Sequence, residues 1–132
     1  MANDSIRVSL TEEPISEVDP FGDARNGADL RFLGVVRGTE GERQISGIRY
    51  SAYPRMALGK MNEIVDAFQQ SAGAHPVCIV HRIGFVAAGE ASIVIAIGQP
   101  HSAEAFSLLA DYLRSIKQEV PIWKHPVFLN TP

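Results

Sequence analysis

Residues 102–124, SAEAFSLLADYLRSIKQEVPIWK, indicate the fold most strongly, because they join a long amphipathic helix to an abrupt end. At about 100° per residue, residues 102–119 form one helix with its apolar side chains gathered on one side. The predicted apolar stripe consists of Phe106, Leu109, Ala110, Leu113 and Ile116. Pro121 cannot continue the helix, so the chain must leave it there. The stretch therefore predicts a core-packed helix followed by an extended segment.

Lys117 falls within this predicted stripe, about 20° from Phe106 and about 40° from Leu113 on a helical wheel. Burying an unpaired ammonium is costly, so a lysine at this position needs an explanation. One explanation is structural, because a cation in the last turn suits the helix dipole and can extend to solvent. The other is functional: Lys124 follows beside Trp123, which would hold that segment in place. Two lysines near one helix end favour an anion-binding site.

The composition is that of an ordinary globular domain. The chain has 132 residues, of which 45% are hydrophobic and 20% charged, enough for one domain with a real core. The net charge of −3 gives no overall attraction to nucleic acid, so any anion site must be local. The single cysteine, Cys78, is interpreted as a small buried hydrophobe. Neither terminus resembles a signal peptide and no apolar run reaches membrane-spanning length, so we expect a cytoplasmic protein without membrane contact.

The rest of the sequence predicts a single α+β domain over residues 1–132. A second helix begins at Pro54 and runs through residue 70, with Gly73 just past its end. Apolar periodicity predicts strands at 6–10, 28–37, 44–53, 77–83, 91–98 and 126–129. We expect a polar loop at 38–42, a turn at 84–90 and a turn-rich segment at 11–27 with room for one short helical turn. This order favours a mixed or mainly antiparallel sheet with two main helices.

Three further positions could contribute to an anion site. His101 precedes the long helix, whose first free N–H groups favour an anion, although the histidine could equally serve only to pack a turn. Ser102 is a residue type that caps helix N-termini. Arg37 ends an apolar strand beside a polar loop, where an ordinary strand-end cation is the simpler interpretation. The residues alone thus predict a small basic pocket built from His101, Lys117, Lys124 and Arg37, for a phosphate ester or carboxylate.

His81 and Arg82 lie next to each other inside a predicted strand. Adjacent strand residues face opposite sides, which favours one packed and one solvated side chain. The four histidines are scattered and the cysteine has no partner at ligand spacing, so no metal site is predicted. No glycine-rich phosphate-binding loop is present either.

Several short stretches recur in the order and spacing of a known family. They are Phe32-x-Gly34-x-Val36-Arg37, Tyr50-x-x-Tyr53-x-x-Met56-Ala57, Val80-His81-Arg82-Ile83-Gly84, Gly89-Glu90-Ala91, Pro100-His101 with Ala105-Phe106, and Lys117-x-x-x-Pro121-Ile122-Trp123-Lys124. With them, the chain resembles the large, catalytic subunit of molybdopterin synthase over about residues 28–127. The resemblance implies an α/β-hammerhead type of fold.

The resemblance also implies an activity, that of a sulfurtransferase in molybdenum cofactor biosynthesis. The family converts cyclic pyranopterin monophosphate to molybdopterin by building its dithiolene. Sulfur arrives as the C-terminal thiocarboxylate of a small ubiquitin-like carrier subunit, whose tail threads into the large subunit's pocket. The large subunit forms a homodimer with a carrier at each end, a heterotetramer. Neither a metal nor another cofactor is implied for the sulfur transfer.

Carried over by position, the resemblance gives roles to individual residues. Lys117 would be the main catalytic group, in proton transfer or in contact with the carrier's terminal carbonyl, and apolar surroundings could lower its pKa. Lys124 would stabilise negative charge on the substrate or carrier. The substrate-binding set implied by the resemblance is Val35, Val36, Arg37, His101, Ser102, Lys117, Lys124, His125 and Pro126. His81-Arg82 would be structural support.

The sequence departs from the family pattern at two site positions. Ser102 stands where the family has arginine after the pocket histidine, and Gly38 stands where asparagine follows the strand-end arginine. We also expect any contribution from a longer C-terminal tail to be missing. An alternative is therefore a non-catalytic or divergent paralogue that binds the carrier tail as a scaffold. A third possibility is an anion-binding module unrelated to the cofactor.

Overall fold

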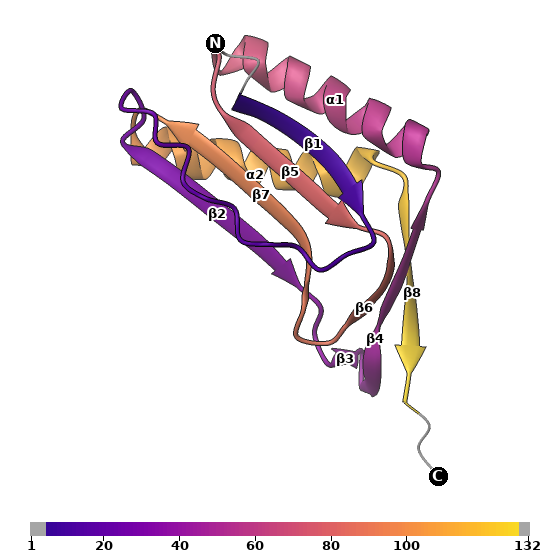
Figure 1. The fold of residues 1–132 in the computed structure, drawn as a ribbon. Helices are drawn as coiled ribbons and strands as arrows, with labels where there is room; N and C mark the ends of the chain where they lie inside the picture. The colour runs from indigo at the N-terminus through magenta and orange to yellow at the C-terminus, as the bar shows by residue number, and fades with distance from the viewer. Residues whose placement is uncertain (1–4, 130–132) are drawn as a thin grey trace.

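Two sheets and two helices make up residues 5–129, the part of the chain described by the computed structural model (Figure 1). The helices are α1 (Pro54–Ser71) and α2 (Ser102–Glu119). The strands are β1 (Ile6–Thr11), β2 (Ala28–Val35), β3 (Thr39–Glu40), β4 (Arg43–Ala52), β5 (Val77–Arg82), β6 (Gly84–Ala87), β7 (Ala91–Gln99) and β8 (Ile122–Phe128). The predicted α+β class is confirmed.

The first sheet has the strand order β1-β5-β7-β2. β1 and β5 run parallel, whereas β5–β7 and β2–β7 are antiparallel, so the prediction of a mixed sheet is confirmed. Alternate residues of the central strands face opposite sides. Ile79 and Ile95 pack with buried residues of both helices, whereas Cys78 and Val94 face the other side. The sheet therefore has an apolar layer on each face.

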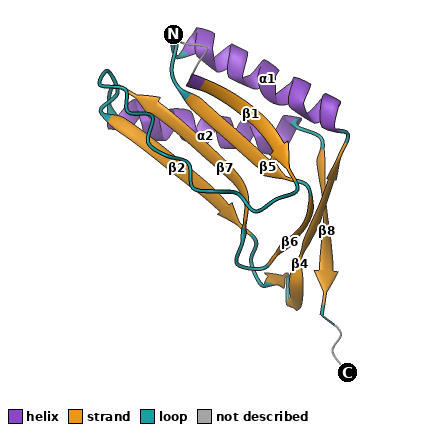
Figure 2. Cartoon of the chain, in the orientation of Figure 1, coloured by secondary structure: helices purple, strands orange, loops and turns teal. Residues whose placement is uncertain are grey.

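Residues 12–27 cover the second of these faces. Ile15, Val18 and Phe21 pack against the cluster that contains Cys78 and Val94. Figure 2 shows this segment as a loop that crosses the sheet on the side away from α2. No helix forms in it, so the short helical turn for which the sequence left room is absent.

The second sheet is built around β4, which pairs antiparallel with both β6 and β8. β3 forms a short hairpin with the start of β4. Three sequence boundaries were wrong here: the loop at 38–42 contains β3, the turn at 84–90 contains β6, and the last strand begins at Ile122 instead of Pro126. The true turn after β6 is marked by the positive φ of Gly89.

The core-facing side of α2 also differs from the predicted stripe. The buried residues are Ala105, Leu108, Tyr112 and Ile116, while Phe106 and Ala110 are exposed. The stripe is rotated because Tyr112 belongs to the core, with its hydroxyl 2.6 Å from Nε2 of His75. Lys117 therefore lies beside the apolar stripe, so its predicted place within the stripe was wrong. Its side chain is exposed, as the structural explanation of a last-turn cation expects. Within the described residues, neither helix is long and apolar enough to cross a membrane.

Candidate functional site

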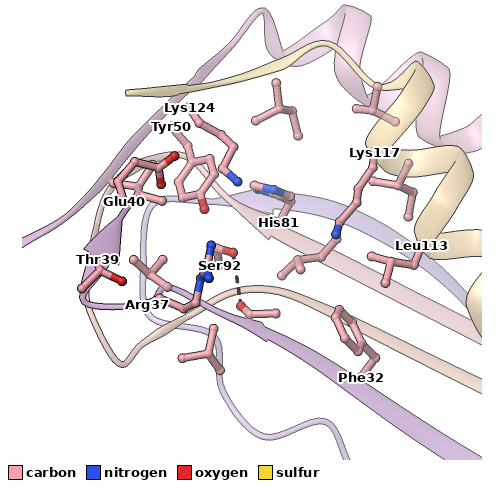
Figure 3. Close-up of a pocket in the computed structure, with 18 residues that line it drawn as sticks. Phe32, Arg37, Thr39, Glu40, Tyr50, His81, Ser92, Leu113, Lys117 and Lys124 are labelled. Atoms are coloured by element: carbon pink, nitrogen blue, oxygen red, sulfur yellow. Dashed lines mark hydrogen bonds between the residues drawn. The ribbon is translucent and has the colours of Figure 1, made fainter. Parts of the chain in front are cut away.

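A cavity of about 460 Å³ lies where the two sheets meet the C-terminal end of α2 (Figure 3). Three cations line it from separate elements: Arg37 follows β2, Lys117 is in the last turn of α2, and Lys124 is on β8. Glu40, on β3, is the acid in the lining. Three positive groups against one negative group make the cavity electropositive in a chain of net charge −3.

The two lysines are positioned by the way α2 ends. The backbone N–H of Val120 donates to the carbonyl of Ile116 at 3.1 Å and closes the helix, and Val120 itself is extended, as a residue before proline tends to be. β8 then pairs with β4 and places Lys124 opposite Tyr50. Lys117 and Lys124 consequently border one cavity from different elements. Apolar side chains, among them Leu113 and Ile122, fill the wall near them.

Tyr50 and His81 form the floor of the cavity near Lys124. Both are buried, and their rings meet edge to face with centroids 5.1 Å apart. Nδ1 of His81 lies 2.7 Å from the carbonyl oxygen of Arg82. Burial lowers the pKa of His81; the hydrogen bond to Arg82 opposes this shift and the charge of Lys124 adds to it. His81 is thus a neutral, oriented imidazole.

Arg82 is buried as well, so the expectation that one residue of the His81-Arg82 pair is solvated was wrong. Its Nη1 donates to Glu90 Oε1 at 2.7 Å, and Nη2 donates to the carbonyl of Phe85 at 3.3 Å. The hydrogen bond from Arg82 to Glu90 is also the main reason that the pKa of Glu90 is lowered. Arg82 therefore ties the end of β5 to the turn after β6, a structural role.

The structure brings five of the predicted site residues together at the cavity: Val35, Val36, Arg37, Lys117 and Lys124. His101 and Ser102 lie at the other end of α2. At 1.5 Å per residue, His101 is about 24 Å along the helix from Lys117. Ser102 does not cap the helix either, because His101 occupies the N-cap position and no side chain caps it. Within one chain, neither residue can belong to the basic pocket predicted from the sequence.

His125 and Pro126 do not line the cavity. His125 points to the opposite side of β8 from Lys124, since neighbouring strand residues alternate. There it lines a second hollow of about 370 Å³ with Tyr53 and Trp123, and its Nε2 lies 3.1 Å from Ser51 Oγ. Pro126 shares the side of Lys124 but sits opposite Ile48, farther along β8.

Sequence reasoning missed Tyr50, His81 and Glu40 as cavity residues. A signal for Tyr50 existed, because it alternates with Ile48 on the inner side of β4. His81 could have been recognised as a titratable residue in an otherwise apolar strand. Glu40 carried no such signal, since its placement depends on the β3 hairpin.

The cavity offers cations, a neutral imidazole and a tyrosine hydroxyl. Such a set can bind an anionic ligand, stabilise negative charge that develops during reaction, and transfer protons. Within residues 5–129, no group of three or more histidine, cysteine, aspartate or glutamate side chains is placed to hold a metal ion.

Comparisons with known proteins show the family of the chain and proteins of similar fold. The family model described as MoaE protein matches residues 6–119. A relative named molybdopterin synthase catalytic subunit, from Emericella nidulans, is 33% identical over 120 residues. That alignment covers 91% of this chain but only 62% of the relative, so the chain spans somewhat less than two thirds of its length.

Two solved structures are similar in fold. Molybdopterin synthase from Staphylococcus aureus has a TM-score of 0.83 and 27% identity, covering 92% of this chain and 91% of that one. A protein–protein complex of subunits 1 and 2 of molybdopterin-converting factor from Helicobacter pylori contains a chain with a TM-score of 0.67 and 21% identity, covering 81% and 70%. The second likeness concerns the fold alone. Because the family model covers most of the chain and the fold agrees, the chain belongs to the MoaE protein family.

Proposed function

We propose that this chain is the catalytic subunit of a molybdopterin synthase. It transfers sulfur from the thiocarboxylated C-terminus of a small ubiquitin-like carrier subunit to cyclic pyranopterin monophosphate and so forms the molybdopterin dithiolene. The observation that carries the proposal is the convergence of Arg37, Lys117 and Lys124 on one cavity in a chain of the MoaE protein family. The substrate phosphate and the carrier thiocarboxylate are both anions and suit this electropositive cavity.

Each of the three cations that line the cavity has a different role in the proposed reaction. Lys117 extends from the end of α2 and can contact the carrier's terminal carbonyl or transfer a proton during attack. Lys124 stabilises the negative charge that develops on substrate or carrier. Arg37 holds the phosphate, because a guanidinium can donate two parallel hydrogen bonds to phosphate oxygens. Main-chain groups of Val35 and Val36 border the same space.

The carrier is the partner that this proposal requires. The Helicobacter pylori neighbour was solved as a two-subunit complex, which supports a small-subunit partner here. A homodimer of the present chain with one carrier at each end would give a heterotetramer. The reaction is assigned to the cytoplasm, a compartment that suits the free, buried thiol of Cys78.

A homodimer is also what a role for His101 would require. His101 and Lys117 lie about 24 Å apart along α2, so one chain cannot place both at one substrate. If both act, His101 must come from a second copy. Mixing inactive His101→Ala and Lys117→Ala chains tests this, because mixed dimers would contain one intact site and regain activity. Failure to regain activity would remove His101 from the site.

The function is tested by product formation. The protein is mixed with thiocarboxylated carrier and cyclic pyranopterin monophosphate, and dithiolene-bearing pterin is assayed. Product supports the enzyme. Carrier binding without product supports the second candidate, a scaffold paralogue, which is favoured by Ser102 in the place of an arginine. In that case Ser102→Arg is the next variant: a large gain in turnover would identify a site that has lost catalysis.

A further inference from the structure

His81 has a hydrogen-bonding pattern that fixes its protonation state. A carbonyl oxygen only accepts hydrogen bonds, so Nδ1, 2.7 Å from the carbonyl of Arg82, carries the hydrogen. In the neutral ring Nε2 is then an acceptor. Within residues 5–129, Nε2 has no hydrogen-bond partner, although His81 is buried and lines the cavity. The imidazole thus presents a free basic nitrogen at a ligand site.

The surroundings keep this nitrogen basic but uncharged. The edge-to-face contact with Tyr50, at 76° between the ring planes, holds the ring orientation. Lys124 from β8 points toward the imidazole in Figure 3, and Lys117 from α2 and Arg37 after β2 border the same space. Glu40 on β3 is the acid in the lining of this cavity. Burial and the charge of Lys124 both disfavour an imidazolium.

We propose that His81 is a catalytic proton acceptor of this cavity, in the step that releases the carrier. The inference rests on the proposed function. Once sulfur has bonded to the pterin, the carrier is attached through a thioester and can leave as a carboxylate only if water attacks the acyl carbon. The water oxygen bonds to that carbon, the acyl C–S bond breaks, and sulfur stays on the pterin as a thiolate. One water proton passes to Nε2 of His81 and then to solvent, and the other leaves from the new carboxylic acid.

In this step different residues stabilise charge and accept the proton. Lys117 and Lys124 offer positive charge to the oxyanion that forms at the acyl carbon, while a protonated lysine cannot accept a proton from water. His81 can, because its Nε2 lone pair is free. General base catalysis of this kind typically contributes about 10²–10⁴-fold in rate.

The test uses two variants that remove different parts of the ring. His81→Asn keeps an N–H donor near the Nδ1 position for the Arg82 carbonyl but has no group at Nε2. His81→Gln places an amide near Nε2 that cannot accept a proton. Both should slow carrier release in single turnover by about 10²-fold or more, and a carrier–pterin thioester should accumulate by intact mass spectrometry. Carrier binding should persist.

A matched control separates this role from packing. His75 is also buried, with hydrogen bonds from its ring to Gly73 and Tyr112, and lies outside the cavity. His75→Asn should lower Tm while the dependence of the release rate on pH stays as in the wild type. In the wild type the rate should fall on acidification as His81 becomes protonated, and this acid limb should disappear in His81→Asn.

The tautomer gives a readout independent of activity. Two-bond ¹H–¹⁵N NMR spectra should show His81 protonated at Nδ1 at neutral pH. The opposite tautomer would overturn the inference whatever the enzyme does. An active wild type whose His81→Asn variant releases carrier normally, with the same acid limb, would overturn the inference and leave the proposed function standing. A wild type without any product would overturn both.

Discussion

Lys117 and Lys124 border the same cavity from the last turn of α2 and from β8, although only six residues separate them in the sequence. The geometry depends on how the chain leaves α2 at Val120 and Pro121. Ile122 donates its N–H to the carbonyl of Val120 at 2.9 Å, which fixes the start of β8 relative to the helix end. The pair is therefore held by backbone structure, and substitution of either lysine should change chemistry more than stability.

Neighbouring residues on β8 should differ sharply in their effect on activity. Lys124→Ala removes a cavity cation and should lower turnover by about 10²-fold or more, as loss of one charge-stabilising group typically does. His125→Ala changes the opposite face of β8 and should leave turnover within about twofold of the wild type. Steady-state kinetics of both variants checks this. A large loss in His125→Ala would show that the face turned away from the cavity takes part.

Tyr112→Phe should destabilise the protein. The Tyr112 hydroxyl is buried 2.6 Å from Nε2 of His75, whose Nδ1 already donates to Gly73, so the substitution leaves a buried acceptor unpaired. The expected loss is about 1–3 kcal/mol of unfolding free energy, measured by urea denaturation. Tyr53→Phe is the control. The side chain of Tyr53 is exposed, so loss of its hydroxyl should change the unfolding free energy little. Equal unfolding free energies of the two variants would show that the buried hydrogen bond between Tyr112 and His75 does not stabilise the protein.

Stability should fall as the pH drops through the histidine range. Burial lowers the pKa of both His75 and His81 in the folded state. The unfolded chain therefore binds protons first, from about pH 6.5 downward, and acidification draws the equilibrium toward it. Urea denaturation between pH 8 and pH 5 should show a declining unfolding free energy. A flat or rising curve would mean that neither histidine is held neutral.

Gly47→Ala should disrupt the second sheet. Gly47 lies on β4 between β6 and β8, and a Cβ there would collide with the main-chain oxygen of Val86 and lie 2.9 Å from Cα of Ala87. Overpacking of this kind typically costs about 1–3 kcal/mol. Gly59→Ala in α1 is the matched control, because nothing lies within 4 Å of the added Cβ, and it should stabilise the helix by up to about 1 kcal/mol. Thermal unfolding measures both effects: Gly47→Ala should lower Tm and Gly59→Ala should not. An unchanged Tm in Gly47→Ala would contradict the predicted collision.

The helices and most strands could be predicted because they follow simple periodicities over many residues. α2 illustrates the limit: the angle between Lys117 and Leu113 follows from helix geometry, but which side faces the sheet does not. That choice depended on Tyr112, whose hydroxyl finds a buried partner from a distant segment. The short strands β3 and β6 carry too few residues for a pattern, and their pairing with β4 comes from tertiary contacts.

The sequence predicted which cations converge on the cavity within one chain, but it also grouped with them residues that lie elsewhere. Arg37, Lys117 and Lys124 meet at the cavity as expected. His101 was placed in the pocket from its position before the helix, and Ser102 was added by resemblance. Neither a position along the sequence nor a resemblance gives a distance in space. His125 could have been separated from Lys124 by strand alternation, had the last strand been predicted to start at Ile122.

The central claim is that Lys117 drives sulfur transfer at this cavity. The most direct measurement is formation of dithiolene-bearing pterin from thiocarboxylated carrier and cyclic pyranopterin monophosphate by wild type, Lys117→Ala and Lys60→Ala. Lys60 is a partly exposed lysine of α1 paired with Glu63, and serves as the matched control. We expect product from wild type and Lys60→Ala, none from Lys117→Ala, and closely similar Tm values for all three. A well-folded Lys117→Ala variant with normal turnover would contradict the account.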